Sequence, residues 1–90
     1  MSPPEILLID DDRRLADMVG RYLGQAGFAV QHQGTAREGL EALGRQVPGL
    51  VLLDLMLPDG DGLDVCRQIR QMTGAAATVP VLMLTARGET

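Results

Sequence analysis

Three uninterrupted apolar runs punctuate the chain, and none of them alternates apolar with polar positions. They cover residues 5–9 (EILLI), 50–54 (LVLLD) and 79–85 (VPVLMLT). Continuous runs of Leu, Ile and Val of this length are typical of strands that are buried on both faces of a parallel sheet. A fourth run, residues 29–33 (AVQHQ), is more polar and alternates, which favours a strand at the edge of the sheet.

A first helix is expected after Asp12, because apolar residues recur there at helical spacing along one face. The pattern ends at Gly24 and Gly27. The residues expected to face the core are Leu15, Met18, Val19, Tyr22 and Leu23.

Two further helices are expected later in the chain. Thr35 and Glu38 form the T-x-x-E pattern of a capping box, which predicts the start of one helix. The other is expected over residues 62–71, and residues 73–78 are expected to form a loop. The apolar positions of these two helices are Ala36, Leu40 and Leu43 in the former and Leu63, Val65, Cys66 and Ile69 in the latter.

Strands therefore alternate with helices from one end of the chain to the other. This order predicts an α/β fold, in which right-handed crossovers build an open, doubly wound parallel sheet. If the polar strand lies at the edge, the spatial order of the strands is 2-1-3-4. The winding then reverses between strands 1 and 3, and ligands of such sheets bind at the carboxyl ends of the strands at this point.

Acidic residues stand where two of these strands end. Asp10 and Asp11 follow the run at residues 5–9, and Asp54 ends the run at residues 50–54. Three carboxylates within about 5 Å would repel one another by roughly 3 kcal/mol per pair at an effective dielectric near 20, so a proton or a cation is expected among them. Because the ligands are hard oxygens, the expected ion is Mg²⁺, with Mn²⁺ as the other possibility.

A carboxylate beside such an ion has a further use, since an Asp can attack a phosphoryl group and form an aspartyl phosphate. The metal offsets the charge that spreads over the transferring oxygens. Thr85 ends the last apolar run, and its hydroxyl could donate a hydrogen bond to the phosphoryl group. The simpler interpretation of Asp10 and Asp11 is that they are acids at a helix start, which is the role expected of Asp12 as N-cap.

Three motifs in this order and spacing resemble the receiver domain of two-component response regulators. They are LLIDDD at residues 7–12, LLDLMLPDGDG at residues 52–62 and VPVLMLTARGE at residues 79–89. The last is most similar to the OmpR/PhoB-like subfamily, whose receivers precede a winged-helix DNA-binding domain. The resemblance covers the whole chain and implies the flavodoxin-like receiver fold.

The resemblance also implies a metal site and a phosphoacceptor. In the family, the acid at the end of strand 3 accepts phosphate from a sensor histidine kinase, which places this role on Asp54. The acids after strand 1 bind Mg²⁺, which here are Asp10 and Asp11. The residue two positions after the acceptor contributes its backbone carbonyl to the metal, and this position is Met56.

Four more residues match positions of the family's motifs. Thr85 corresponds to the hydroxyl residue that turns toward the phosphate as a switch, and the backbone of Ala86 is expected to bind the phosphate beside it. Pro58 and Gly62 match the turn after the acceptor. His32 is expected to be solvent-exposed on the edge strand and not to act as a phosphoryl donor.

The chain departs from the family pattern at its end. The family has a fifth strand that ends in a catalytic Lys, followed by a closing helix, whereas this chain ends at Thr90 and contains no Lys. Residues 1–90 are therefore expected to be the N-terminal part of a receiver domain, with the effector domain outside this chain. We expect self-association through the exposed edge of the fourth strand, or through a bare apolar face over strands 1 and 3.

Composition narrows the location and the partners. The net charge of −4 argues against direct contact with nucleic acid. No apolar run is long enough to cross a membrane, no signal peptide is visible and Cys66 is the only cysteine, so a cytoplasmic location is expected.

The leading hypothesis is a signalling domain that is phosphorylated on Asp54 and is not a turnover enzyme. A phosphohydrolase with Asp54 as nucleophile is disfavoured, because the second acid of the D-x-D pattern of such enzymes is replaced by Met56. A phosphorylation-independent interaction or dimerisation module remains as the alternative, because strand 5 and its Lys are missing.

Overall fold

A four-stranded parallel sheet runs through the middle of the protein in the order β2-β1-β3-β6. The computed structural model describes residues 3–84. The strands of this sheet are β1 (Glu5–Ile9), β2 (Ala29–Gln33), β3 (Leu50–Asp54) and β6 (Val81–Leu84). Because β6 is the fourth strand of the sheet along the chain, the predicted α/β fold and the order 2-1-3-4 are confirmed, with the polar strand β2 at an edge.

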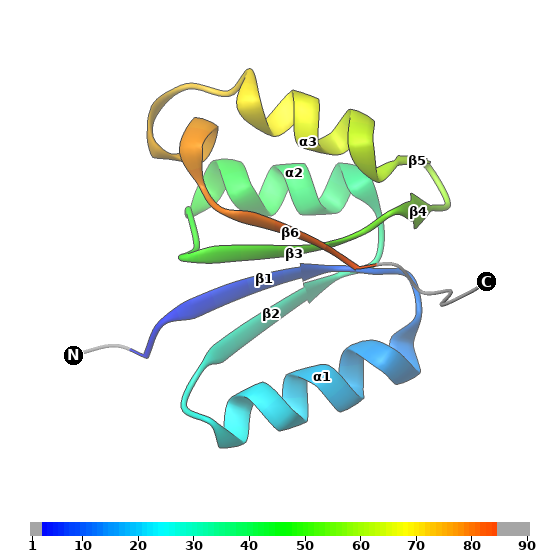
Figure 1. Ribbon diagram of the computed structural model, residues 1–90, viewed down its shortest axis with the longest axis vertical. Helices are drawn as coiled ribbons and strands as arrows, with labels where there is room; N and C mark the ends of the chain where they lie inside the picture. The colour runs from blue at the N-terminus through cyan, green and yellow to red at the C-terminus, as the bar shows by residue number, and fades with distance from the viewer. Residues whose placement is uncertain (1–2, 85–90) are drawn as a thin grey trace.

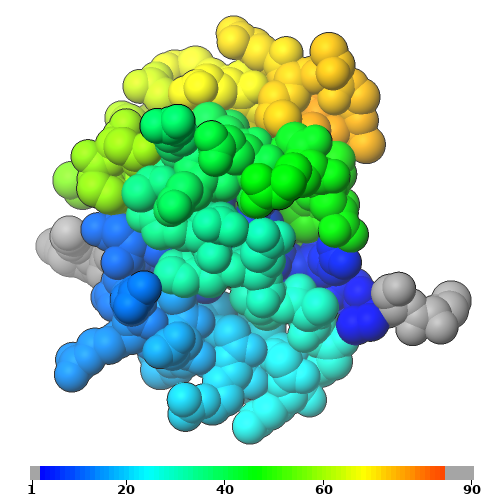
Figure 2. All heavy atoms as spheres, turned by 180° about the vertical axis from the view of Figure 1, so that it is seen from behind, coloured from blue at the N-terminus to red at the C-terminus, as the bar shows by residue number. Residues whose placement is uncertain are grey.

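Helices cover both faces of the sheet. Helix α1 (Arg13–Gln25) lies on one face, and α2 (Ala36–Arg45) and α3 (Gly62–Arg70) lie on the other (Figure 1). Seen from behind, the green atoms of α2 lie between the blue and cyan atoms of α1 and the yellow atoms of α3 (Figure 2). No helix within residues 3–84 is long and apolar enough to cross a bilayer.

Side chains cap the start of each of the three α-helices. The Asp12 carboxylate accepts a hydrogen bond from the Leu15 N–H at 3.1 Å, as predicted for an N-cap. The Thr35 hydroxyl oxygen accepts from the Glu38 N–H at 3.1 Å, which confirms the helix start that the capping box predicted. Asp61 caps α3 in the same manner.

The core consists of two clusters, one on each face of the sheet. Between the sheet and helices α2 and α3, the residues with almost no exposed surface are Ile9, Leu43, Val51, Leu53, Val65 and Ile69. Between the sheet and α1, the buried residues are Ile6, Leu8, Ala16 and Leu52. The strands are therefore buried on both faces, as their unbroken apolar sequences predict.

Helix α1 buries only part of the apolar face that was predicted, since Val19 and Leu23 pack against the core but Met18 and Tyr22 do not. Met18 and Tyr22 are 61% and 72% exposed. The buried residue is Ala16, with Val19 and Leu23 packed beside it. The apolar stripe is wider than the surface in contact, and the helix settles on the side where a small residue allows close approach to the sheet.

Helix α3 also buries a narrower stripe than predicted. Val65 and Ile69 are fully buried and Cys66 is partly buried against them, but Leu63 is exposed. Leu63 precedes Val65 by two residues, or about 200° around the helix, so it faces away from the sheet.

Two connections contain structure where only turns or loops were predicted. Strands β4 (Met56–Leu57) and β5 (Gly60–Asp61) form a short antiparallel hairpin directly after β3. Residues 73–78, predicted to be a loop, contain the 3-10 helix η1 (Gly74–Thr78), where three consecutive Ala residues favour helical conformations.

The prediction of a bare apolar face over strands 1 and 3 is wrong. Ile6, Leu8 and Leu52 on that face are buried in the cluster that includes α1. The exposed residue is Leu82 of β6, at 56%, which shares this face because Leu84 packs there and successive side chains alternate. Within residues 3–84, β6 pairs with β3 alone, so one of its edges has no strand beside it.

Candidate functional site

The carboxyl ends of β1 and β3 bring two acids together from distant parts of the sequence. The strands are adjacent and parallel, with Ile9 opposite Leu53. Asp10 follows β1 and Asp54 ends β3, so both side chains lie at the same edge of the sheet. Both are buried, with 2% and 6% of their surface exposed.

A third acid completes a compact cluster. Asp10, Asp11 and the Asp54 carboxylate each offer one oxygen, and these oxygens lie within 4.8 Å of one another. Asp11 is exposed and Asp10 and Asp54 are buried, so the cluster is open on one side. Carboxylate oxygens at this separation are suitable ligands for a hard divalent cation. The predicted meeting of the three acids is confirmed.

Within residues 3–84, the negative charge of this cluster is poorly compensated. Burial raises the pKa of the Asp10 carboxyl above its ordinary value, and the negative charges of Asp54 and Asp11 raise it further. A hydrogen bond from the Asp12 N–H to Asp10 Oδ1, at 2.8 Å, acts in the other direction and lowers this pKa. A cation at the cluster would relieve this excess of negative charge, so the residues present fit a divalent metal.

The Asp54 carboxylate is held by the backbone of the hairpin that follows it. The Met56 N–H donates to Asp54 Oδ1 at 3.2 Å. Met56 is in β4, and its side chain is exposed to solvent. The phosphoacceptor candidate is therefore oriented by the residue whose carbonyl was predicted to bind the metal.

Gly62, the first residue of α3, lies so close to the end of β3 that a larger residue would not fit there. The Gly62 N–H donates to the Leu55 carbonyl at 2.7 Å. A Cβ atom at Gly62 would lie 2.6 Å from the Asp54 carbonyl oxygen and 2.9 Å from Leu55 Cα. Pro58 lies in the turn between β4 and β5, as expected. Thr85 and Ala86, the predicted switch and phosphate-binding positions, lie outside the described residues.

One residue near the site was assigned wrongly from the sequence. His32 was predicted to be solvent-exposed, but it is half-buried, and its Nε2 lies 2.6 Å from the Asp10 carbonyl oxygen. The prediction failed because β2 ends beside Asp10 and the imidazole reaches across to the neighbouring strand. Alternation along β2 gives the face of the sheet on which His32 lies but not this contact.

A second residue, Asp59, was overlooked altogether. Its carboxylate accepts hydrogen bonds from the Ala36 N–H at 2.8 Å and the Arg37 N–H at 3.1 Å. These bonds lower the pKa of the Asp59 carboxyl. They connect the hairpin after Asp54 to the start of α2, 23 residues earlier in the chain.

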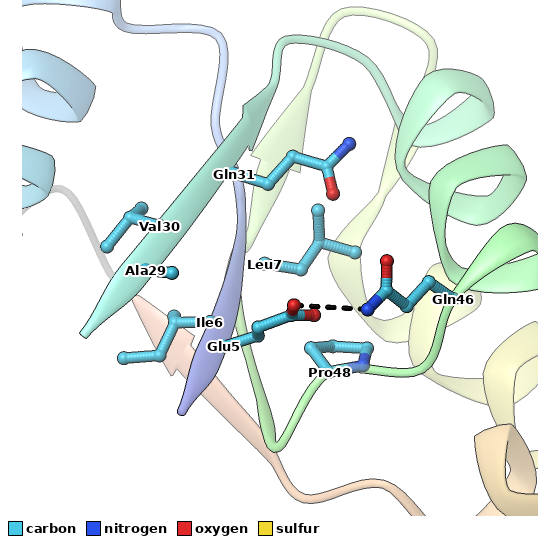
Figure 3. Close-up of a pocket in the computed structure, with 8 residues that line it drawn as sticks. All are labelled: Glu5, Ile6, Leu7, Ala29, Val30, Gln31, Gln46 and Pro48. Atoms are coloured by element: carbon cyan, nitrogen blue, oxygen red, sulfur yellow. Dashed lines mark hydrogen bonds between the residues drawn. The ribbon is translucent and has the colours of Figure 1, made fainter. Parts of the chain in front are cut away.

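A small hollow lies beside the amino ends of β1 and β2, at the end of the strands opposite to the acid cluster. It has a volume of about 140 Å³ and is lined from β1, β2 and the segment after α2. Its polar side chains include Glu5, which accepts a hydrogen bond from Gln46 Nε2 at 3.0 Å (Figure 3). This hollow is separated from the acid cluster by the length of β1, so Glu5 provides a useful control for variants of the acids.

The sequence of residues 6–90 matches the family described as the response regulator receiver domain. The chain belongs to this family. Receiver domains bind Mg²⁺ at an acidic pocket and interact with histidine kinases, and in this chain Asp10, Asp11 and Asp54 form an acidic pocket.

Curated relatives of this receiver domain are longer proteins. RpaA of Synechocystis sp., a DNA-binding dual master transcriptional regulator, is 46% identical over 87 residues, which are 96% of this chain and 35% of RpaA. MtrA of Mycolicibacterium paratuberculosis, a DNA-binding response regulator, is 45% identical over 85 residues, or 94% of this chain and 36% of MtrA. The chain thus spans about a third of the length of these OmpR/PhoB-family relatives, and the predicted subfamily is confirmed.

Solved receiver domains share the fold. The N-terminal domain of a response regulator receiver protein from Methanoculleus marisnigri JR1 superposes with a TM-score of 0.86 at 36% identity, covering 96% of this chain and 69% of that one. The BeF3-activated N-terminal receiver domain of RstA from Klebsiella pneumoniae gives a TM-score of 0.81 at 32% identity, covering 94% and 69%.

Proposed function

We propose that this receiver domain accepts a phosphoryl group on Asp54 from a phosphohistidine of a sensor histidine kinase. The observation that carries the proposal is the convergence of Asp54 with Asp10 and Asp11, whose oxygens lie within 4.8 Å of one another. The domain is a signalling module of the cytoplasm and not a turnover enzyme, because the phosphoryl group ends on the protein itself. Its output passes to an effector domain outside this chain, which regulates transcription.

In the proposed reaction, a carboxylate oxygen of Asp54 attacks phosphorus, the new O–P bond forms and the P–N bond to the kinase imidazole breaks. Oδ1 is held by the Met56 N–H. Within residues 3–84 no hydrogen bond to Oδ2 is formed, so we assign the attack to Oδ2. The imidazole leaves with the electron pair of the broken bond and is then protonated.

The proposed ligands of the cation are the carboxylates of Asp10, Asp11 and Asp54 and the backbone carbonyl of Met56. Mg²⁺, or Mn²⁺ in its place, would supply positive charge against the oxygens of the transferring group. Asp10 is suited to this role because its carboxylate is buried beside those of Asp11 and Asp54, and a cation would counter their mutual repulsion. We assign Thr85 and the backbone of Ala86 to binding the phosphoryl group once it is on Asp54.

Phosphorylation by a small acyl phosphate in the presence of Mg²⁺ tests the assignment of Asp54. Mass spectrometry is expected to find one phosphoryl group on the parent chain and none on Asp54→Asn. Asp64→Asn is the matched control, since Asp64 is an exposed acid that pairs with Arg67 on α3. Equal labelling of Asp54→Asn and the parent would overturn the proposal.

A second candidate function is phosphorylation-independent self-association. The observation that favours it is the edge of β6, which has no strand beside it within residues 3–84 and carries the exposed Leu82. Sedimentation of the parent and of Leu82→Lys distinguishes the two functions. Dimers of the unphosphorylated parent that Leu82→Lys dissociates would support self-association, and a monomeric parent would exclude it.

A further inference from the structure

Both backbone groups of Asp10, the N–H and the carbonyl, are bonded to residues of β2. Its N–H donates to the Gln33 carbonyl at 3.0 Å, which is the last bond of the parallel ladder between β1 and β2. Its carbonyl lies beyond the end of the ladder, and there the His32 side chain takes the place of a strand, with Nε2 at 2.6 Å. A side chain of the edge strand thus continues the pairing by one more bond.

We propose that His32 is a positioning residue for the acid pocket and acts through Asp10. The proposal rests on the proposed role of Asp10 as a metal ligand. The N–H and the carbonyl of Asp10 belong to the two peptide planes that flank its Cα, so fixing both groups fixes the direction of its side chain. The plane that carries the Asp10 carbonyl also carries the Asp11 N–H, so the start of Asp11 is oriented by the same bond.

The fixed backbone of Asp10 holds its carboxylate in a buried position. It is 2% exposed, and its Oδ1 accepts from the Asp12 N–H at 2.8 Å. A buried carboxylate is costly to hold in charged form, and a freely moving backbone would let it turn toward water. The His32 bond opposes this movement and keeps the oxygen near those of Asp11 and Asp54.

The bond also specifies the proton on the imidazole. A carbonyl oxygen only accepts hydrogen bonds, so His32 Nε2 must carry the hydrogen. The neutral ring is therefore the Nε2–H tautomer. The ring also borders a surface hollow beside Asp17 and Gly20 of α1, which leaves room for other side chains of similar length.

The test compares two variants of His32 with one control. His32→Leu removes the donor, whereas His32→Gln places an amide N–H close to the position of Nε2. Gln31→Leu is the control, because Gln31 is the preceding residue of β2 and points to the opposite face. Each protein is titrated with Mg²⁺ alone by calorimetry, and its unfolding is measured in chelator.

We expect Mg²⁺ to bind about tenfold more weakly to His32→Leu than to the parent. This is the lower end of the loss of metal affinity that is usual when a residue that orients a metal ligand is replaced. His32→Gln should recover most of the affinity, and Gln31→Leu should bind like the parent. A merely structural role for His32 would lower stability in chelator without changing the affinity of the folded protein for Mg²⁺. Equal affinity in His32→Leu and the parent would overturn the proposal.

A measurement on the parent alone remains decisive if His32→Leu does not fold. Nitrogen-15 spectra of the imidazole report the tautomer, and the Nε2–H form is expected. A dominant Nδ1–H form would overturn the His32 proposal and leave the assignment of Asp54 untouched. Failure of the parent to bind Mg²⁺ would instead count against the proposed function, so the two failures are distinguishable.

Discussion

Asp59 accepts a hydrogen bond from the backbone N–H of Ala36 at 2.8 Å, which fastens the hairpin after the phosphoacceptor to the first residue of α2. A second bond, from the Arg37 N–H, makes the contact bidentate. Two of the N–H groups that every helix start leaves without intrahelical partners are thereby satisfied by a residue from another element. The carboxylate also lies at the positive end of the α2 dipole. Asp59 therefore links the geometry after Asp54 to the packing of α2.

Replacing Asp59 by Ala should destabilise the protein, and the loss should depend on pH. The hydrogen bonds lower the pKa of the folded carboxyl below its ordinary value of 3.8. Between the lowered pKa and pH 3.8, the folded state therefore binds fewer protons than the unfolded state. The stability that Asp59 contributes is fully present above pH 3.8 and is lost as the pH falls through the lowered pKa. Urea unfolding of the parent and Asp59→Ala across this range measures the difference.

Asp59→Asn is the matched variant for the pH dependence. The amide oxygen still accepts one bond but has no proton to gain, so the acid limb of the stability curve should flatten. If the parent and Asp59→Asn lose stability in parallel as the pH falls, protonation of Asp59 does not change the free energy of unfolding.

Asp10→Asn should stabilise the protein in the absence of divalent cations. Burial, together with Asp54 and Asp11, raises the folded pKa above 3.8. The folded state then binds more protons than the unfolded state, so the contribution of Asp10 to stability falls as the pH rises from 3.8 through the raised pKa. At neutral pH the amide avoids this cost and still accepts the Asp12 N–H, which should raise the urea midpoint in chelator.

The same variant should lose the response to Mg²⁺. A ligand that binds the folded state alone stabilises it by about 2.7 kcal/mol at 100 times its dissociation constant. The parent should gain this stability and Asp10→Asn should not. Glu5→Gln is the control, because it removes one acid at the other end of β1, where Gln46 is its partner. A gain of equal size in Asp10→Asn would exclude Asp10 as a ligand.

The acid cluster was predictable because it follows from the sheet alone. Unbroken apolar runs predict buried parallel strands, and the polarity of residues 29–33 predicts the edge, so the adjacency of β1 and β3 is determined before any contact is known. Asp10 and Asp54 then meet because the carboxyl ends of adjacent parallel strands lie together.

The contacts of His32 and Asp59 could not be predicted in the same way. They join residues that are 22 and 23 positions apart through single side chains, and no periodic pattern specifies such a bond. The width of the buried face of α1 was overpredicted for a related reason, since Val19 and Leu23 pack against the core and Met18 and Tyr22 do not. Hydrophobic periodicity gives the width of an apolar face, but the shape of the sheet decides which part of that width is buried.

Gly62→Ala should be destabilising by about 1–3 kcal/mol, as is usual for overpacking. The new Cβ would meet the Asp54 carbonyl oxygen at 2.6 Å, and since the obstacle is backbone, β3 or the hairpin must move. Mg²⁺ affinity should fall as well, because Asp54 shifts. Gly20→Ala is the control: its nearest neighbour, a Val30 methyl carbon, lies at 3.9 Å, so the change should stabilise α1 by roughly 0.5–1 kcal/mol. Unchanged stability in Gly62→Ala would contradict the close approach.

Tyr22 and Leu23 are neighbours on α1, both predicted to face the core, and their truncation should have very different effects. Leu23→Ala should cost about 2 kcal/mol, the lower end of the range for buried Leu, because Leu23 packs against the cluster beneath α1. Tyr22→Ala should change stability by less than about 0.5 kcal/mol, since the ring is 72% exposed. Urea unfolding of both variants measures the two losses of stability. A larger loss for Tyr22→Ala would mean that α1 is rotated in solution to the face that the sequence pattern favours.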